Sequence, residues 1–156
     1  MSNQATLPPG VSRSQFEAAL LEYRAIVGEE NVVAEPERLA PYARLMVPDK
    51  IEKHMPCGAI SAGSVEDIQK ILAVSNKYRI PLWTISAGRN FGYGEAAPAT
   101  AGQMVLDLKR MNKILEIDPE LGTALIEPGV TFKQIDDYLK ENNLPYWINK
   151  PAPAPV

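Results

Sequence analysis

The segment with the clearest chemical potential is residues 86–94, SAGRNFGYG, which contains three glycines and one arginine. Glycine lets the backbone adopt positive φ angles and approach a ligand closely. Successive main-chain N–H groups in such a loop form an anion-binding concavity, to which Arg89 can add a charged donor. A diphosphate group is the ligand that best suits this combination.

The glycine spacing, GxxxGxG, differs from the two best-known phosphate-binding loops. A Walker loop requires Lys and Ser or Thr after its last glycine, and both are missing here. The dinucleotide fingerprint GxGxxG requires a helix after the loop, whereas the pattern predicts a strand. From the residues alone, a long surface loop without a ligand therefore remains an alternative.

The elements around this loop follow a strand, helix, strand order. Residues 59–62 form a short apolar run, Ser64 caps a helix, and residues 80–86, IPLWTIS, have the composition of a buried strand. A further strand is expected at 103–108, directly after the loop. This order favours parallel pairing of the first two strands through a right-handed crossover.

The rest of the chain completes an α+β pattern. We expect a helix at 12–28, capped by Ser14 with Glu17 and ended by Gly28. A shorter helical piece broken by Pro41 and an extended connection at 46–56 should follow. Further along the chain, the expected elements are antiparallel strands at 113–118 and 123–127, a helix capped by Thr131, and a last strand at 146–148. The fold class is α+β, a mixed sheet with helices on one face.

Composition excludes several functions. The net charge of -3 provides no positive field for nucleic acid, and no apolar stretch approaches the roughly 20 residues that span a bilayer. The chain has no signal-peptide pattern, so a cytoplasmic or periplasmic location is expected. Cys57 is the single cysteine and is interpreted as a small buried residue. The acidic residues do not converge with His or Cys, so no metal site is predicted.

Three segments together carry a family resemblance: WTISAGRNFGYGEAAP, VLDLKRMNKILEID and ALIEPGVTF. In this order and spacing they resemble the FAD-binding domain of the vanillyl-alcohol oxidase and para-cresol methylhydroxylase flavoprotein family. The resemblance extends from LPPGVSRSQFEAAL to ENNLP and is greatest to the cresol-oxidising branch. It implies the N-terminal subdomain of a PCMH-type FAD-binding domain, with FAD as cofactor.

The resemblance also implies roles for individual residues. Tyr93 would bind the substrate as a phenolate, although a tyrosine that merely packs the loop is the alternative. His54 lies near a position where some relatives have a histidine associated with flavin attachment, but an ordinary exposed histidine is the preferred interpretation. Trp83 is interpreted as a core residue. The residues expected to contact FAD are Ser86, Ala87, Gly88, Arg89, Asn90, Phe91, Gly92, Pro128, Gly129 and Val130.

The implied reaction is oxidation or hydroxylation of the para-alkyl carbon of a phenol by hydride transfer to the flavin. Water would supply the oxygen, and a cytochrome c or molecular oxygen would accept the electrons; an oligomer is also compatible. No catalytic residue is assigned within this chain. The relatives are longer, so a truncated product that binds FAD weakly and turns over little is expected. A nucleotide- or phosphate-binding module without catalysis, or a decayed product, remains open.

The expected organisation has three parts. Residues 1–52 would be a lead-in with helices, residues 53–150 the N-terminal half of the FAD-binding domain, and residues 151–156 a proline-rich tail. The tail, PAPAPV, is of low complexity and is interpreted as an end rather than a folded element.

Overall fold

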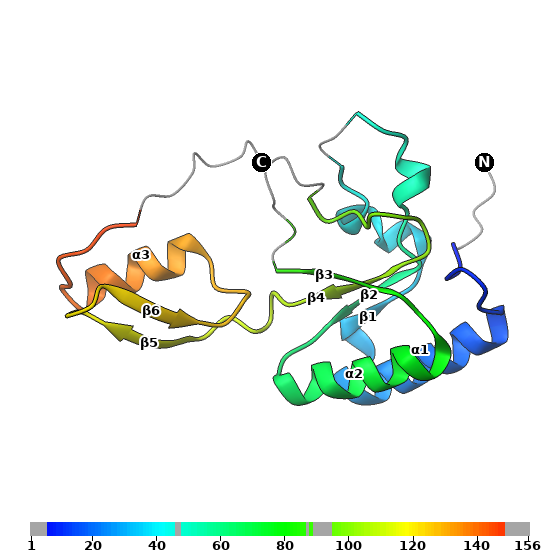
Figure 1. Ribbon diagram of the computed structural model, residues 1–156, viewed down its shortest axis with the longest axis horizontal. Coiled ribbons are helices and arrows are strands. Elements are labelled where there is room, and N and C mark those ends of the chain that lie inside the picture. The colour runs from blue at the N-terminus through cyan, green and yellow to red at the C-terminus, as the bar shows by residue number, and fades with distance from the viewer. Residues whose placement is uncertain (1–5, 46–47, 87, 89–94, 149–156) are drawn as a thin grey trace. The chain divides into compact units, whose positions relative to one another are not determined.

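The computed structural model describes residues 6–45, 48–86, 88 and 95–148. The chain divides into two compact units, Met1–Arg110 and Met111–Val156. Each unit is described by itself below (Figure 1). In the part of the chain described, no helix combines the length and apolar character needed to cross a membrane.

The first unit contains a four-stranded mixed sheet in the order β1-β2-β4-β3. Strand β2 (Gly58–Ser61) and strand β3 (Leu82–Ile85) both pair in parallel with β4 (Met104–Asp107), which lies between them. The short β1 (Val32–Val33) pairs antiparallel with β2 at the other edge. The mixed sheet of the α+β prediction is therefore confirmed.

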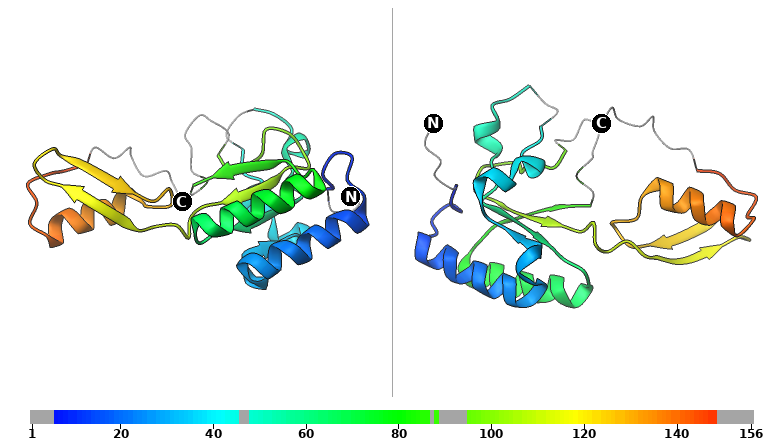
Figure 2. Two further views of the ribbon diagram at one scale, coloured as in Figure 1. Left: turned by 60° about the horizontal axis from the view of Figure 1, so that its bottom comes forward. Right: turned by 180° about the vertical axis from the view of Figure 1, so that it is seen from behind.

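Two helices, α1 (Arg13–Val27) and α2 (Val65–Tyr78), lie side by side on one face of this sheet (Figures 1 and 2). The apolar residues of each helix recur at helical spacing and face the core. Tyr23 is fully buried at the centre, and its hydroxyl lies 2.8 Å from the hydroxyl of Ser75 in α2. Burial raises the pKa of Tyr23 to about 12. The main core is thus formed between the helices and this face.

The opposite face of the sheet carries a smaller apolar cluster. It contains Leu39, Ala59, Ile85, Ala96 and Val105, against which Tyr42 and Trp83 pack. Short 3-10 turns precede β2 in the chain: η1 (Glu29–Asn31), η2 (Pro36–Arg38), η3 (Ala40–Tyr42) and η4 (Ile51–His54).

The second unit is a hairpin with a helix. Strands β5 (Ile114–Asp118) and β6 (Thr123–Ile126) pair antiparallel, as predicted, with an irregular register between Ile114 and Glu116. Helix α3 (Phe132–Glu141) is capped by Thr131, whose side chain forms a reciprocal capping box with Gln134. Ile135 and Leu139 are its buried residues.

Four local predictions need correction. Helix α1 is capped by Ser12 with Gln15, not by Ser14 with Glu17, because the Ser12 side chain accepts from the Gln15 N–H. Parallel β2 and β3 are separated by β4 rather than paired directly. The connection at 46–56 includes the 3-10 turn η4. Residues 146–148 are not a strand, since they pair with no other strand among the described residues.

Candidate functional site

The candidate site lies at the carboxyl ends of the three parallel strands. Ser61, Asp107 and Ile85 end β2, β4 and β3 and occupy the same register position. Ser86 follows β3 directly and is exposed, whereas Gly88 is buried. Ligands of sheets with parallel strands bind outside these carboxyl ends. The topology therefore places the start of the glycine-rich loop at the edge of the sheet where a ligand is expected to bind.

Gly88 is a position where only glycine fits without strain. Its φ angle is +67°, in the left-handed region. A Cβ atom added there would lie 3.0 Å from the Cβ of Ala96 and 3.3 Å from Cδ1 of Ile85. The backbone at Gly88 is therefore packed closely against the apolar cluster of this face.

A buried carboxylate fixes the end of β4. Asp107 is 2% exposed, and its Oδ2 accepts hydrogen bonds from the hydroxyl of Tyr42 and from Nζ of Lys109, each at 2.8 Å. Its Oδ1 accepts from the backbone N–H of Lys109 at 2.9 Å. Burial, followed by the bond to Asp107, raises the pKa of Tyr42. Because the carboxylate is fully satisfied, it is suited to holding η3 on the sheet edge rather than to acid–base chemistry.

Two further groups at this edge were not identified from the sequence. The buried Ser61 hydroxyl has no hydrogen-bond partner among the described residues. Nη1 of Arg110 donates to the Ser61 carbonyl at 2.8 Å. A polar residue that ends a buried apolar strand, as Ser61 does in GAIS, is the only sequence signal that could have indicated the first of them.

The turn Glu127–Thr131 belongs to the second unit. Gly129 is buried, and its N–H donates to the Met111 carbonyl at 2.7 Å. The N–H of Val130 donates to the Glu127 carbonyl at 3.1 Å, which closes the turn, and Pro128 is exposed. The three predicted contact residues of this segment are therefore held in one tight turn. These residues belong to the second unit, whereas Ser86 and Gly88 belong to the first unit.

Six predicted site residues lie outside the described part of the chain: Ala87, Arg89, Asn90, Phe91, Gly92 and Tyr93. Their contacts with cofactor or substrate remain predictions.

Three other residues singled out from the sequence have defined environments. Cys57 is fully buried, and burial raises the pKa of its thiol to about 12, which makes it unreactive at neutral pH. Trp83 is half-buried against the smaller cluster, but its Nε1 has no partner among the described residues. His54 is not the exposed histidine that was expected, since its side chain is only 15% exposed and both ring nitrogens have partners.

Comparison with known proteins identifies the family. Residues 56–155, well over half of the chain, match the family model described as "FAD binding domain". The chain belongs to this FAD-binding domain family. FAD is accordingly the cofactor of the domain, as the sequence predicted.

Individual relatives agree with the family match. The chain is 49% identical over 154 residues to the 4-cresol dehydrogenase (hydroxylating) flavoprotein subunit of Pseudomonas putida, covering 99% of this chain and 30% of the relative. A crystal structure of p-cresol methylhydroxylase with substrate bound superposes with a TM-score of 0.87 at 51% identity, over 90% of this chain and 27% of that one. A 4-ethylphenol oxidase from Gulosibacter chungangensis superposes with a TM-score of 0.82 at 38% identity, over 89% and 27%.

These comparisons confirm the resemblance to the para-cresol methylhydroxylase family and the fold class. The chain spans about 30% of the length of the curated relative from Pseudomonas putida.

The residues at the carboxyl edge fit the diphosphate part of FAD. Gly88 leaves no room for a side chain, the Ser61 hydroxyl lacks a partner among the described residues, and the Arg110 guanidinium provides positive charge. A diphosphate needs hydrogen-bond donors and a compensating charge, which these groups can supply without a metal ion. Among the described residues, no cluster of His, Cys, Asp and Glu could hold a metal.

Proposed function

We propose that this chain is the FAD-binding part of a flavoenzyme that oxidises or hydroxylates the para-alkyl carbon of phenols. The observation that carries the proposal is the match to p-cresol methylhydroxylase, with a TM-score of 0.87 at 51% identity. A second phenol-oxidising relative, the 4-ethylphenol oxidase, supports the same substrate class.

The chain's own residues would contribute binding and positioning. Main-chain groups from Ser86 to Gly92 would hold the FAD diphosphate, and the turn Pro128–Val130 would contact the rest of the cofactor. Tyr93 would bind the phenol oxygen and favour the phenolate, which pushes electron density towards the para carbon. The bound FAD would supply the hydride acceptor. No catalytic residue is proposed within this chain.

The electron acceptor and the assembly are also proposals. The Pseudomonas putida relative is named a flavoprotein subunit, so it forms part of a larger assembly. A cytochrome c would accept electrons from the flavin in such an assembly. A para-substituted phenol, a cytochrome and further copies of the chain are therefore the proposed partners.

A ligand series tests the cofactor site in the purified chain. We expect FAD and ADP to bind and to raise the melting temperature, because a ligand that binds only the folded state stabilises it by mass action. FMN, which lacks the diphosphate, should bind much more weakly. If FMN binds as well as FAD, or if none of the three binds, the proposed role of the loop in this chain is wrong.

A further inference from the structure

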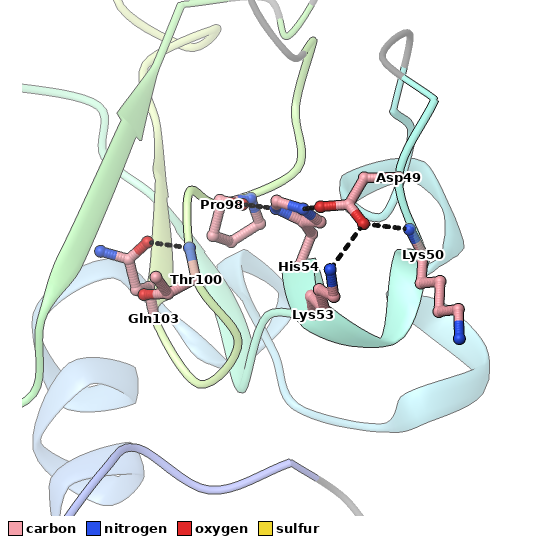
Figure 3. Close-up of polar contacts among 7 residues, drawn as sticks. All are labelled: Asp49, Lys50, Lys53, His54, Pro98, Thr100 and Gln103. Carbon is pink, nitrogen blue, oxygen red and sulfur yellow. Dashed lines mark hydrogen bonds and ion pairs between the residues drawn. The ribbon is translucent and has the colours of Figure 1, made fainter.

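The side chain of His54 lies between two hydrogen-bond acceptors. Its Nδ1 is 2.8 Å from the carbonyl oxygen of Pro98, and its Nε2 is 3.1 Å from Oδ2 of Asp49 (Figure 3). Neutral imidazole carries one N–H and can donate to only one of them, whereas imidazolium donates to both. Both contacts can therefore be hydrogen bonds donated by His54 only when its imidazole is protonated.

The two acceptors belong to different segments of the first unit. Asp49 precedes the η4 turn, and Pro98 lies in residues 95–102, which lead into β4. Main-chain bonds join the same two segments on either side of His54. The N–H of Ala97 donates to the Arg44 carbonyl at 3.2 Å, and the N–H of Gly102 donates to the Met55 carbonyl at 2.9 Å.

An ion pair adds to these contacts between residues 44–55 and residues 95–102, which are together called the joint below. Nε of Arg44 lies 3.1 Å from a carboxylate oxygen of Glu95, whose side chain is 11% exposed. Glu95 also has a φ angle of +51°, which is uncommon for a residue with a side chain. Residues 95–102 are thus fastened to residues 44–55 at several points. His54 is the chain's single histidine and hence the one side-chain contact expected to change charge near neutral pH.

The charges around the imidazole act in opposite directions. Asp49 favours the cation, whereas Lys53 of the same turn opposes it and also pairs with Asp49 at 2.9 Å. From the facing segment the contact is the uncharged Pro98 carbonyl, while Thr100 and Gln103 bond to each other. The Pro98 carbonyl first, and then Asp49, raises the pKa of His54 above its ordinary value. The pKa of Asp49 is lowered, chiefly by Lys53, so it remains charged.

We propose that His54 is a positioning residue. As imidazolium it bonds to Pro98 and Asp49 at once and holds residues 95–102 firmly on the η4 turn, and it holds them less firmly when it loses its proton and can donate only one of the two bonds. Residues 95–102 come directly after the glycine-rich loop in the sequence. The proposal therefore extends to the cofactor: FAD affinity should fall as the pH rises through the His54 titration. This extension rests on the proposed function, whereas the joint between the two segments does not.

The direction of the pH effect follows from linkage. A histidine with a folded-state pKa above that of the unfolded chain stabilises the fold fully below the unfolded value of about 6.5. That contribution is lost as the pH rises through the folded-state pKa. The joint should therefore be firm in mildly acidic solution and looser on the alkaline side.

Titration of the full chain by NMR tests the joint without FAD, because only one histidine contributes signals. We expect His54 to titrate above the ordinary value of about 6.5, and Asp49→Asn to lower that pKa. Glu52→Gln, which changes an exposed carboxylate on the same turn, is the matched control and should have a much smaller effect. A His54 that titrates at or below the ordinary value, or that ignores Asp49→Asn, overturns the proposal.

Hydrogen exchange supplies a second readout. The protection factors of the Ala97 and Gly102 amides should fall as His54 loses its proton. In His54→Gln, which can donate one hydrogen bond but does not titrate, they should not depend on pH over this range. Should His54→Gln not fold, Asp49→Asn gives the same comparison, with the fall moved to lower pH. Equal pH dependence in the wild-type chain and the variants contradicts the role of His54.

The cofactor extension is tested by FAD titration on both sides of the measured His54 pKa. We expect the wild-type Kd to rise several-fold at the higher pH and the Kd of His54→Gln to stay constant. If FAD does not bind at either pH while the NMR and exchange results hold, the proposed function fails in this chain and the joint stands. If FAD binds with the same pH dependence in both proteins, the extension to the cofactor is wrong.

Discussion

At the residue scale, Gly88 is the described position at which the cofactor site is most sensitive to substitution. Gly88→Ala would place a Cβ in a left-handed conformation and 3.0 Å from Ala96. We expect FAD affinity to fall by about tenfold or more, equivalent to roughly 1.4 kcal/mol, because the loop must shift to relieve the contact. Isothermal titration measures this change.

Gly10→Ala is the matched control for Gly88. Gly10 also has a positive φ, +74°, but its added Cβ would meet no atom within 4 Å. The control should lose stability through the strained backbone while it keeps its FAD affinity. Equal losses of affinity in both variants would show that general destabilisation, and not the site, is responsible.

A second prediction at the residue scale concerns Ser61, whose replacement should affect the stability of the free chain and its affinity for FAD differently. Its hydroxyl is buried without a partner among the described residues, and an unsatisfied polar group is costly in the folded state. Ser61→Ala should therefore leave the melting temperature of the free chain unchanged or higher. If FAD supplies the missing partner, the same variant weakens FAD binding. A drop in stability without FAD would contradict the assignment of an unsatisfied hydroxyl.

At the element scale, the packing of α1 on α2 depends on one buried polar pair. Tyr23→Phe removes the hydrogen-bond partner of the Ser75 hydroxyl, and Ser75 is only 5% exposed. We expect a loss of about 1–3 kcal/mol in the free energy of unfolding, measured with urea, because the Ser75 hydroxyl stays buried and unpaired. Adding Ser75→Ala should recover part of the loss, since neither polar group then remains. Tyr78→Phe, which removes a part-buried bond to Glu22, should cost less.

The elements themselves were largely predictable from the sequence, because their signals are local. Periodic apolar residues and caps at Ser64 and Thr131 locate α2 and α3, and their side chains accept the expected N–H groups. The strand order was not predictable in the same way. Insertion of β4 between β2 and β3 pairs β4 with β2, whose partner residues, such as Gly58 and Met104, are 46 positions apart, and the pattern of a strand contains no information about its neighbour.

The candidate site shows the same limit. The glycine-rich loop is recognisable because its composition reflects a local backbone requirement, and Gly88 meets it. The contact of His54 with Pro98 spans 44 residues, and the network of Tyr42 with Asp107 spans 65. No spacing rule connects such residues, so a histidine expected to be exposed is in fact held between two acceptors.

At the scale of the whole molecule, the second unit exposes apolar side chains that a stable monomer normally covers. Leu115 and Leu125 lie on the paired strands β5 and β6 and are 56% and 58% exposed. Each of these strands has one partner in the part of the chain that the structure describes, which leaves a free edge beside the apolar residues. Exposed apolar patches and free strand edges both promote association.

We therefore expect the purified chain to self-associate with increasing concentration and to bind a hydrophobic dye. The double variant Leu115→Thr with Leu125→Thr should reduce both effects, because threonine retains strand propensity and removes apolar area. Leu21→Gln is the control, since Leu21 is 66% exposed but lies on α1 in the first unit. Sedimentation velocity over a concentration series measures the association. If the control reduces association as much as the double variant does, the exposed leucines of the β5–β6 hairpin are not its cause.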